Sequence, residues 1–379
     1  MTRRVLVVSH EASRTGAPRV AVEVLRSLAP LGVRRIALLR WDGPMKDEFR
    51  AHAEAVSLEP IRRFRALLRR QHRTRAIANR LEELVAGAVI LRHRPHVVYL
   101  NTVKSASYIR PALLLRRPVV LHVHELEPLA SQTLARFRLE RSYTGVHLVA
   151  CSAEVRDNLA LITGVDAGDI VVVQSAVDQA RIGSLARRPA GVPPVEPPGA
   201  VVVGSCGLAN TGKGVDIWLD MAGLVRSRAS QLAIDVRFVW VGREDFDGLA
   251  DTLRRLGLED VVRFTGDLSN PYPEIASFDV FTHTARQDSF PLAILEAMAL
   301  GRPVVAFDVG GIRGQLGDTG VLVPAGDVEA MAEAVTALAG DAASRGEIGS
   351  RAGERAARRF SIDRLHTTIR QVVGALAAP

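Results

Sequence analysis

The chain has 379 residues, which predicts two to three domains. Hydrophobic residues make up 47% of it and charged residues 24%, a globular composition that argues against a disordered protein. No apolar run approaches the roughly 18 residues of a membrane-spanning helix, and Val5–Val8 is too short for a signal peptide, so a cytoplasmic protein is expected. Two cysteines, Cys151 and Cys206, are too few for a disulfide framework or a zinc site.

The net charge of +8 rests almost entirely on arginine, because Lys46, Lys104 and Lys213 are the only lysines among 49 basic residues. This skew is typical of GC-rich coding. No recognisable nucleic-acid-binding module accompanies it, so nucleic acid is not an expected partner.

The first half alternates short β-branched runs with amphipathic segments. The expected strands are Val5–Ser9, Ile36–Arg40, His96–Asn101, Val119–His124, His147–Cys151 and Ile170–Gln174. The expected helices are Ala17–Leu31, Ile61–Arg92, Ala130–Ser142 and Glu154–Ile162. Apolar strands separated by helices predict a parallel sheet covered on both faces, and thus a Rossmann-like domain over residues 1–186.

Five prolines within Arg187–Gly199 predict a linker over residues 187–199, after which the alternation restarts. The expected strands are Ala200–Cys206, Val236–Val241, Val261–Gly266, Val280–His283, Val304–Phe307 and Gly320–Val323. The expected helices are Val215–Arg228, Gly248–Leu256, Pro291–Leu300, Val328–Ala339, Ala343–Arg359 and, after a break, Ile362–Leu376. Residues 200–360 thus form a second doubly wound α/β domain. Because such sheets bind ligands beyond the carboxyl ends of their strands, a site in a cleft between the two domains is expected.

Two carboxylates, Asp288 and Glu296, stand eight residues apart, one in the loop after Val280–His283 and one inside the following helix. Asp288 also suits a helix N-cap. Glu296 lies among apolar neighbours, where a carboxylate needs a hydrogen-bonding partner, either a structural one or the hydroxyls of a ligand.

The segment around these carboxylates resembles the E-x7-E motif of retaining glycosyltransferases of family 4 (group 1), which have the two-domain GT-B fold. The resemblance extends over Ser277–Phe281, Asp288–Val305, Gly310–Ile312 and Thr319–Asp327, with Asp288 in place of the first glutamate. It implies that the final helix, residues 361–379, returns to the first domain.

The same resemblance implies a nucleotide-diphosphate sugar as donor, with Asp288 on the sugar hydroxyls and Glu296 on the ribose. The helix starting near Ser289 would direct N–H groups at the diphosphate. The backbone of Ser289, Phe290, Pro291 and Leu292 would line this site.

A Gly-rich stretch, Gly204–Asp216, follows the first strand of the second domain. It resembles the family's G-R-L-x-x-x-K-G segment, which implies that Gly212 and Lys213 contact the leaving diphosphate. The family's arginine is Leu208 here, and Arg243 is a candidate replacement. The alternative for Lys213 is a solvated lysine at a helix start.

In the first domain, the loop after Val5–Ser9 holds His10 and Arg14, which are candidates for the acceptor side. Gly16 and Ala17 open the next helix and resemble the family loop that faces the donor phosphate.

His122 and His124 share one face of a strand by the two-residue period. A structural role and a metal pair are the alternatives for them, but no third ligand has metal-site spacing. The resemblance places His124, and His122 second, near the reacting sugar.

The expected helix over residues 61–80 is Arg-rich and amphipathic. It reads as a solvated surface helix or as a weak peripheral contact with the inner face of a membrane.

The predicted function is therefore retaining transfer of a sugar to an acceptor hydroxyl, by a front-face mechanism without metal or cofactor. His124, Lys213 and Asp288 are the catalytic candidates. The acceptor is a carbohydrate, a lipid-linked molecule or a small molecule. The alternatives are a nucleotide-sugar epimerase of the same fold and an inactive nucleotide-sugar-binding protein.

Overall fold

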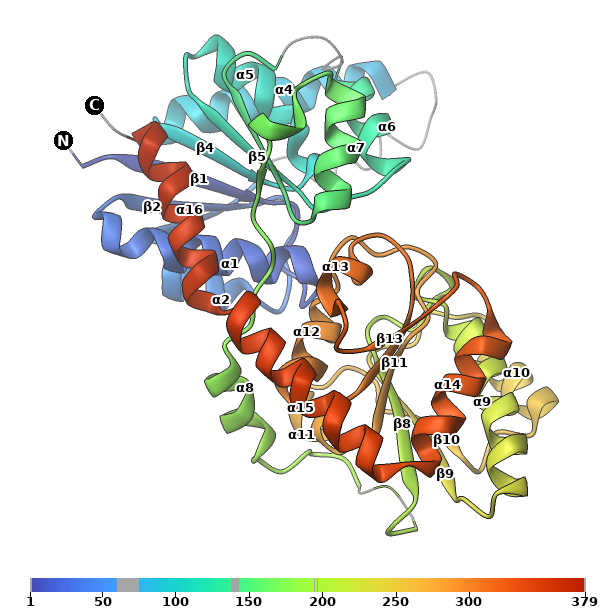
Figure 1. Cartoon of the computed structure of the whole chain (residues 1–379). Coiled ribbons are helices and arrows are strands. Elements are labelled where there is room, and N and C mark those ends of the chain that lie inside the picture. Colours follow the sequence, from blue (N-terminus) through green and yellow to red (C-terminus); the bar gives the residue numbers. More distant parts are fainter. Residues whose placement is uncertain (1, 60–74, 138–142, 194, 196, 378–379) are drawn as a thin grey trace. The chain divides into compact units, whose positions relative to one another are not determined.

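The computed structural model describes residues 2–59, 75–137, 143–193, 195 and 197–377 (Figure 1). The chain divides into two compact units. Unit 1 comprises Met1–Ser175 together with Asp363–Pro379, and unit 2 comprises Ala176–Ile362.

Unit 1 contains a wholly parallel sheet whose described strands run in the order β3-β2-β1-β4-β5-β6-β7. The strands are β1 (Arg4–Ser9), β2 (Arg34–Leu39), β3 (Ala55–Leu58), β4 (Val97–Asn101), β5 (Val119–Val123), β6 (Val146–Ala150) and β7 (Val171–Val172). Its helices are α1 (Gly16–Leu28), α2 (Lys46–His52), α4 (Arg75–His93), α5 (Ile109–Leu114), α6 (Leu129–Arg136) and α7 (Ala153–Thr163), together with α16 (Ile362–Ala377). Strands β4 and β5 are buried along their whole length, as expected for a sheet covered by helices on both faces.

Helix α16 packs on unit 1, where it lies beside α1 (Figure 1). Its apolar face is buried at Leu365, Ile369 and Val373. At its polar edge, His366 Nε2 lies 3.0 Å from Glu23 Oε2 on α1. Burial raises the pKa of Glu23, but the contacts with His366 and Arg26 outweigh it, so the net shift is downward and the carboxylate stays ionised.

Unit 2 contains a second parallel sheet, whose described strands run in the order β10-β9-β8-β11-β12-β13. They are β8 (Val201–Cys206), β9 (Val236–Val241), β10 (Val262–Phe264), β11 (Val280–His283), β12 (Val304–Phe307) and β13 (Val321–Val323). Its helices are α8 (Gln179–Ala186), α9 (Val215–Gln231), α10 (Leu249–Leu256), α11 (Tyr272–Ala276), α12 (Leu292–Ala299), α13 (Ile312–Leu316), α14 (Val328–Gly340) and α15 (Ala342–Arg359). Trp218 of α9 and Trp240 of β9 are buried in its core with their rings 5.2 Å apart.

The division between the units differs from the predicted one. The chain passes from unit 1 to unit 2 after Ser175, not at residue 186, because α8 is held by unit 2. Gln179 of α8 donates to the carbonyl of Ala299, and Asn270 donates to the carbonyl of Leu185. The Pro-rich stretch 187–199 consequently lies within unit 2.

The two ends of the unit 2 segment are neighbours. Val177 pairs with Ser361 in an isolated parallel bridge, and the Val177 N–H donates to the carbonyl of Phe360 over 3.0 Å.

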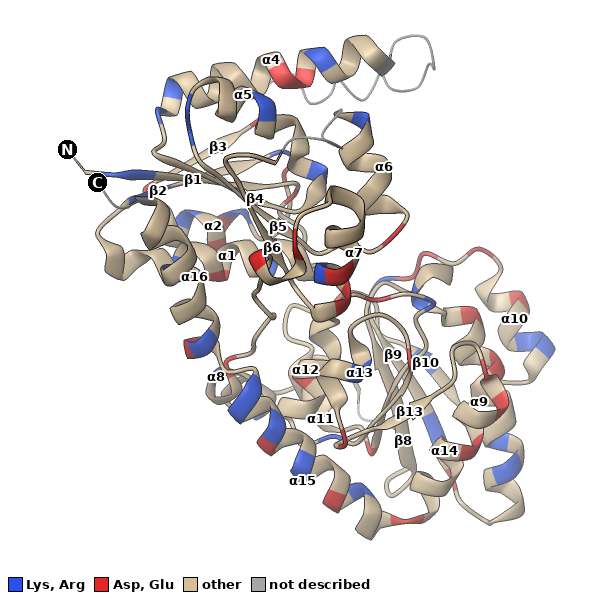
Figure 2. Ribbon diagram, turned by 45° about the horizontal axis from the view of Figure 1, so that its top comes forward, with Lys and Arg blue, Asp and Glu red and all other residues tan. Residues whose placement is uncertain are grey.

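Several elements differ from the sequence prediction in detail. The short edge strand β3 was not predicted, because its four residues are only partly buried and carry no strong apolar run. The Arg-rich segment 61–80 falls mostly on residues 60–74, outside the described residues, and α4 starts at Arg75. None of the described helices combines the length and apolar content needed to cross a membrane. Helix α15 carries both basic and acidic positions (Figure 2), with Arg358 and Arg359 in its last turn.

Candidate active site

The order of both sheets reverses at a pair of central strands, β1 and β4 in unit 1 and β8 and β11 in unit 2. Loops after such strands diverge and leave room for a ligand at the carboxyl edge. The predicted site residues of unit 1 lie at the end of β5 or in the loop and helix start after β1, and those of unit 2 lie after β8 and β11, except Arg243, which follows β9.

In unit 2, the loop after β8 turns into α9 through the 3₁₀ turn Thr211–Lys213. Asn210 caps this turn, because its Oδ1 accepts the Lys213 N–H over 2.9 Å. Gly214 follows with φ at +70°, a backbone conformation that glycine adopts without steric penalty.

Lys213 and Asp288, predicted separately, are in direct contact. Lys213 Nζ lies 2.5 Å from Asp288 Oδ2, and the same oxygen lies 3.2 Å from His283 Nε2 at the end of β11. The Asp288 and His283 side chains are 11% and 4% exposed, whereas Lys213 is 37% exposed. The ammonium therefore has one side toward the carboxylate and another toward solvent.

The charges of this cluster are strongly coupled. Burial raises the pKa of Asp288, but the Lys213 ammonium and the His283 hydrogen bond outweigh it and hold the pKa well below its usual value of 3.8. Burial lowers the pKa of His283 despite the neighbouring carboxylate. At neutral pH the cluster is thus a cation, an anion and a neutral imidazole.

Asp288→Asn is expected to lower the free energy of unfolding of unit 2 by about 1–3 kcal/mol at pH 6. Because folding lowers the pKa of Asp288, its ionised form stabilises the fold above about pH 3.8. That contribution is lost as pH falls through the lowered pKa, so the deficit of the variant should narrow in acid. Urea unfolding followed by tryptophan fluorescence at a series of pH values measures it.

A Trp41→Phe background makes this readout specific, because the remaining tryptophans, Trp218 and Trp240, are both buried in unit 2. Asp260→Asn is the matched control, since Asp260 pairs with Arg226 on the surface of the same unit. An exposed pair contributes little, so this control should stay within about 1 kcal/mol of the parent. A deficit of Asp288→Asn that is unchanged from pH 6 to pH 3 would contradict the assigned charge state.

The Gly-rich loop is fastened to the loop after β11. Thr284 Oγ1 donates to the Gly214 carbonyl over 2.9 Å, and the Arg286 N–H donates to the Gly212 carbonyl over 3.2 Å. The Arg286 guanidinium also donates to the Thr211 carbonyl and grips Asp216 with two hydrogen bonds of 2.9 and 2.6 Å. Lys213 is therefore held from both sides of its turn.

Helix α12 begins at Leu292, not near Ser289 as predicted, because Pro291 has extended backbone angles and takes the N-cap position. The loop before α12 is held by hydrogen bonds to two of its backbone carbonyls. Gln315 donates to the Pro291 carbonyl over 2.9 Å, and the Gly311 N–H donates to the Asp288 carbonyl. No described side chain caps the N-terminus of α12.

Glu296 is 2% exposed on α12, and its Oε1 accepts a hydrogen bond from the Tyr272 hydroxyl over 3.0 Å. Tyr272 opens α11 and was not predicted as part of the site. That Glu296 binds the ribose of the donor stays a prediction. One of its carboxylate oxygens already accepts a hydrogen bond from the protein, from Tyr272.

Arg243, the predicted replacement for the missing arginine, is exposed after β9. Its carbonyl accepts the Ala209 N–H over 2.9 Å, which sets its backbone beside the loop that leads to Lys213. No described contact of its side chain ties it to Lys213, so its predicted role stays a prediction.

In unit 1, His122 and His124 lie at the carboxyl end of β5 with their rings 4.2 Å apart. His122 is fully buried with Nδ1 2.8 Å from the Tyr99 hydroxyl, and burial lowers its pKa to about 4. Burial, His122 and His10 likewise hold the pKa of His124 well below its usual value. Both rings are neutral at physiological pH.

Asn101, at the end of β4, was not predicted as a site residue. Its side chain makes two hydrogen bonds. Asn101 Oδ1 lies 3.1 Å from His124 Nε2, and Asn101 Nδ2 donates to the carbonyl of Ala17 over 2.6 Å. Ala17 and Gly16 form the first turn of α1, as predicted for this loop. A polar side chain at the carboxyl end of a buried strand was the signal that could have identified Asn101.

The loop after β1 is organised by Glu11. Its Oε1 accepts from Ser13 over 2.7 Å and lies 3.3 Å from His10 Nε2. The hydrogen bond with His10 is the main reason that the pKa of Glu11 falls to about 2, although burial opposes it. His10 is largely buried and Arg14 is exposed.

Comparison with known proteins bears on both units. A family model described as glycosyltransferase family 4 matches residues 14–181, and one described as glycosyl transferases group 1 matches residues 198–341. The chain belongs to glycosyltransferase family 4 (group 1).

Curated relatives of this family 4 member include the D-inositol 3-phosphate glycosyltransferase of Kribbella flavida. It is 31% identical over 225 residues, which cover 55% of this chain and 52% of that protein. The lipopolysaccharide core biosynthesis mannosyltransferase LpsB of Rhizobium meliloti is 33% identical over 150 residues, 38% of this chain and 43% of LpsB. The chain thus spans about half the length, or less, of these relatives.

Among solved structures, Anabaena HepE in complex with UDP and glucose has a TM-score of 0.75 at 20% identity, covering 98% of this chain and 100% of HepE. WaaG, a glycosyltransferase involved in lipopolysaccharide biosynthesis, has a TM-score of 0.76 at 13% identity, covering 98% and 100%. These likenesses confirm the predicted fold of two Rossmann-like domains.

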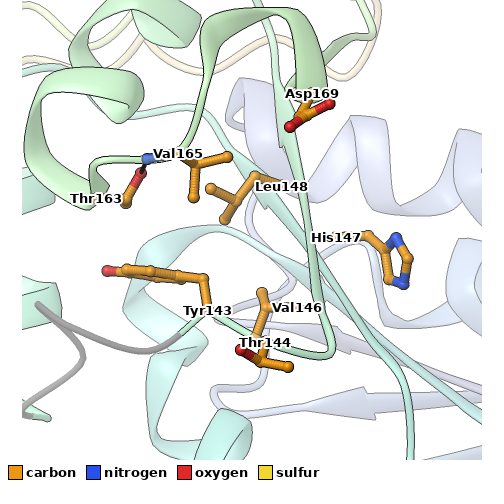
Figure 3. A pocket seen from close by; sticks show the side chains of 8 residues that line it. All are labelled: Tyr143, Thr144, Val146, His147, Leu148, Thr163, Val165 and Asp169. Carbon is orange, nitrogen blue, oxygen red and sulfur yellow. Dashed lines mark hydrogen bonds between the residues drawn. The ribbon is translucent and has the colours of Figure 1, made fainter.

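A pocket of about 520 Å³ in this family 4 chain lies elsewhere in unit 1, at the start of β6 and the end of α7 (Figure 3). Figure 3 shows the side chains of Tyr143 and His147 pointing in opposite directions, so its polar groups do not converge. Within the described parts of the chain, no group of three or more His, Cys, Asp or Glu side chains is placed to hold a metal ion.

Proposed function

We propose that this protein transfers a glycosyl group from a nucleotide-diphosphate sugar to an acceptor hydroxyl, with retention at the anomeric carbon. The observation that carries the proposal is the Lys213–Asp288 pair after the two central strands of unit 2. Its support is the membership of family 4 and the position of both residues in the family's motifs.

The pair suits a site where negative charge develops on a leaving diphosphate. Lys213 is partly exposed and fixed by its backbone, so its ammonium can stabilise that charge with little reorganisation. Asp288, kept ionised by Lys213, can accept hydrogen bonds from sugar hydroxyls. The backbone N–H groups at the start of α12 follow directly after this carboxylate and favour anions.

We assign the donor to unit 2 and the acceptor to unit 1. The name of the Kribbella flavida relative contains D-inositol 3-phosphate, a polyhydroxylated molecule, and LpsB is named for lipopolysaccharide core biosynthesis, which supports a polyol or carbohydrate hydroxyl as acceptor here. Neutral imidazoles and polar side chains at the carboxyl edge of unit 1 suit uncharged hydroxyl groups.

A calorimetric panel of UDP-, GDP-, dTDP- and ADP-linked sugars tests the donor site directly. One donor is expected to bind the parent protein with micromolar affinity and to lose at least tenfold in Lys213→Ala and in Glu296→Gln. Lys46→Ala is the matched control, because Lys46 forms a 2.9 Å pair with Asp42 in unit 1 and should leave binding unchanged. Equal binding by all variants would contradict the assigned donor site.

Product analysis then separates the three activities. A transferase releases the nucleotide faster when a polyol acceptor is present and forms a glycoside with the donor's anomeric configuration. An epimerase converts the sugar without any acceptor, and a binding protein leaves the donor intact. Either of the last two outcomes would overturn the proposed transfer.

A further inference from the structure

His283 is a buried polar side chain at the end of β11, and the sequence motifs of the site do not include it. A buried imidazole needs a hydrogen-bonding partner to offset the hydration that it loses. Among the described residues, the partner of its ring is the carboxylate of Asp288, whose Oδ2 lies 3.2 Å from Nε2. The presence of a histidine at this buried position is therefore connected with Asp288.

The backbone that carries His283 is held on both sides. Thr282 Oγ1 donates to the carbonyl of Gly204 on β8 over 2.9 Å, and Thr284 Oγ1 donates to the carbonyl of Gly214 over 2.9 Å. Strand β11 itself lies between β8 and β12 in the sheet of unit 2. The imidazole is thus carried by a fixed part of the unit.

The carboxylate determines which nitrogen of His283 carries the proton. Asp288 is ionised at neutral pH, so its Oδ2 can only accept, and the ring nitrogen that faces it, Nε2, must donate. Burial lowers the pKa of His283, so the ring is neutral and Nε2 holds its one hydrogen. The imidazole is therefore a fixed, uncharged donor to Asp288.

Lys213 donates to the same oxygen, but its side chain is less confined. It is 37% exposed, against 4% for His283, and its ammonium lies at the end of a flexible four-carbon stem. In the proposed reaction this ammonium also stabilises the leaving diphosphate, so a second anion competes with Asp288 for it. A carboxylate that depended on the lysine alone would move with it or lose its partner when the donor binds.

We propose that His283 is a positioning residue that holds the Asp288 carboxylate through its Nε2–H while Lys213 engages the diphosphate of the donor. The part played by the donor rests on the proposed function, whereas the hydrogen bond between His283 and Asp288 does not. The two tasks of the cluster are divided in this way. The exposed cation stabilises the leaving group, and the neutral ring fixes the carboxylate that accepts hydrogen bonds from the sugar.

The first test needs no ligand. It uses ¹⁵N NMR of the full chain with labelled histidine, the His283 signals being assigned with His283→Gln. At neutral pH the expected spectrum shows a protonated Nε2 and an unprotonated Nδ1. In Lys213→Ala, which removes the ammonium, the same tautomer should persist, because His283 still donates to Asp288. An unprotonated Nε2 in the parent protein or in folded Lys213→Ala would overturn the proposal.

The second test compares three substitutions of His283 in the transfer reaction. Glutamine can place an amide N–H where Nε2 lies, whereas asparagine is one methylene shorter and leucine has no donor. We expect His283→Leu and His283→Asn to lower kcat/KM by about 10- to 100-fold, and His283→Gln to recover most of the parent rate. Binding of the free nucleoside diphosphate, which lacks the sugar, should be unchanged in all three variants, because Lys213 is still present to contact it.

A merely structural role for His283 would give a different result. Damage to unit 2 would weaken nucleotide binding in parallel with the rate, and urea unfolding in the Trp41→Phe background would detect it. That outcome, equal rates for His283→Gln and His283→Asn, or a parent-like rate for His283→Leu would each overturn the positioning role. If the parent protein transfers no sugar from any donor, the proposed function fails, and the NMR experiment alone decides whether His283 holds Asp288.

Discussion

Replacing Lys213 by alanine is expected to lower kcat/KM for sugar transfer by about 10²- to 10³-fold. The ammonium is the partner that keeps Asp288 ionised, and in the proposed reaction it also stabilises the charge that develops on the leaving diphosphate. Initial rates of nucleotide release, measured over a range of donor concentrations, separate the loss in kcat from the rise in KM.

Lys46→Ala provides the comparison for this result, because it removes a lysine from another Lys–Asp pair of this arginine-dominated chain. We expect its rate to equal that of the parent. Urea unfolding in the Trp41→Phe background verifies that Lys213→Ala still contains a folded unit 2. If Lys213→Ala is folded and its rate is within threefold of that of the parent protein, Lys213 does not contribute to the reaction as proposed.

Gly214→Ala is expected to destabilise unit 2 by several kcal/mol or to displace the Lys213 turn. An added Cβ would lie 1.9 Å from the carbonyl oxygen of Thr284, which is backbone and cannot rotate away. The fastening of this loop by Thr284 would be lost with it. Unfolding by urea, again followed by Trp218 and Trp240, measures the effect.

Gly248→Ala separates this collision from the cost of the backbone conformation. Gly248 precedes α10 with φ at +80°, much as Gly214 precedes α9 at +70°, but a Cβ there would have no atom within 4 Å. Both variants carry the left-handed penalty of about 1–2 kcal/mol, so their difference reports the contact with Thr284. If Gly214→Ala and Gly248→Ala lower the free energy of unfolding equally, the loop after β11 moves to accommodate the added Cβ at little energetic cost.

Periodicity in the sequence was enough to predict the alternation of strands and helices, because the central strands are continuous apolar runs. Strands β9, β11 and β12 were predicted with their observed bounds. Short half-buried elements such as β3 and α8 carry too few apolar residues for such a pattern, and α8 packs on a unit that periodicity could not identify.

For the candidate site, motifs identified the residues but not their pairing. Lys213 and Asp288 are 75 positions apart, and their contact depends on β8 and β11 being neighbours, which spacing alone does not determine. His283 and Asn101 were overlooked because each reads as the last residue of a strand. Their roles became visible only through the partners that the fold brings to them.

The bridge between Val177 and Ser361 has a consequence for the order of folding. Unit 2 is a single continuous segment, whereas the contact between Glu23 and His366 in unit 1 joins residues 343 positions apart. Once unit 2 has folded, its two ends are adjacent, and the loop that α16 must close on α1 is roughly halved. Each halving lowers the entropy cost of closure by only about 0.6 kcal/mol, but it also removes the slow search of a long unfolded chain. Folded unit 2 thus holds its two ends together and shortens the loop between α1 and α16. We therefore expect α16 to dock on unit 1 after unit 2 has folded.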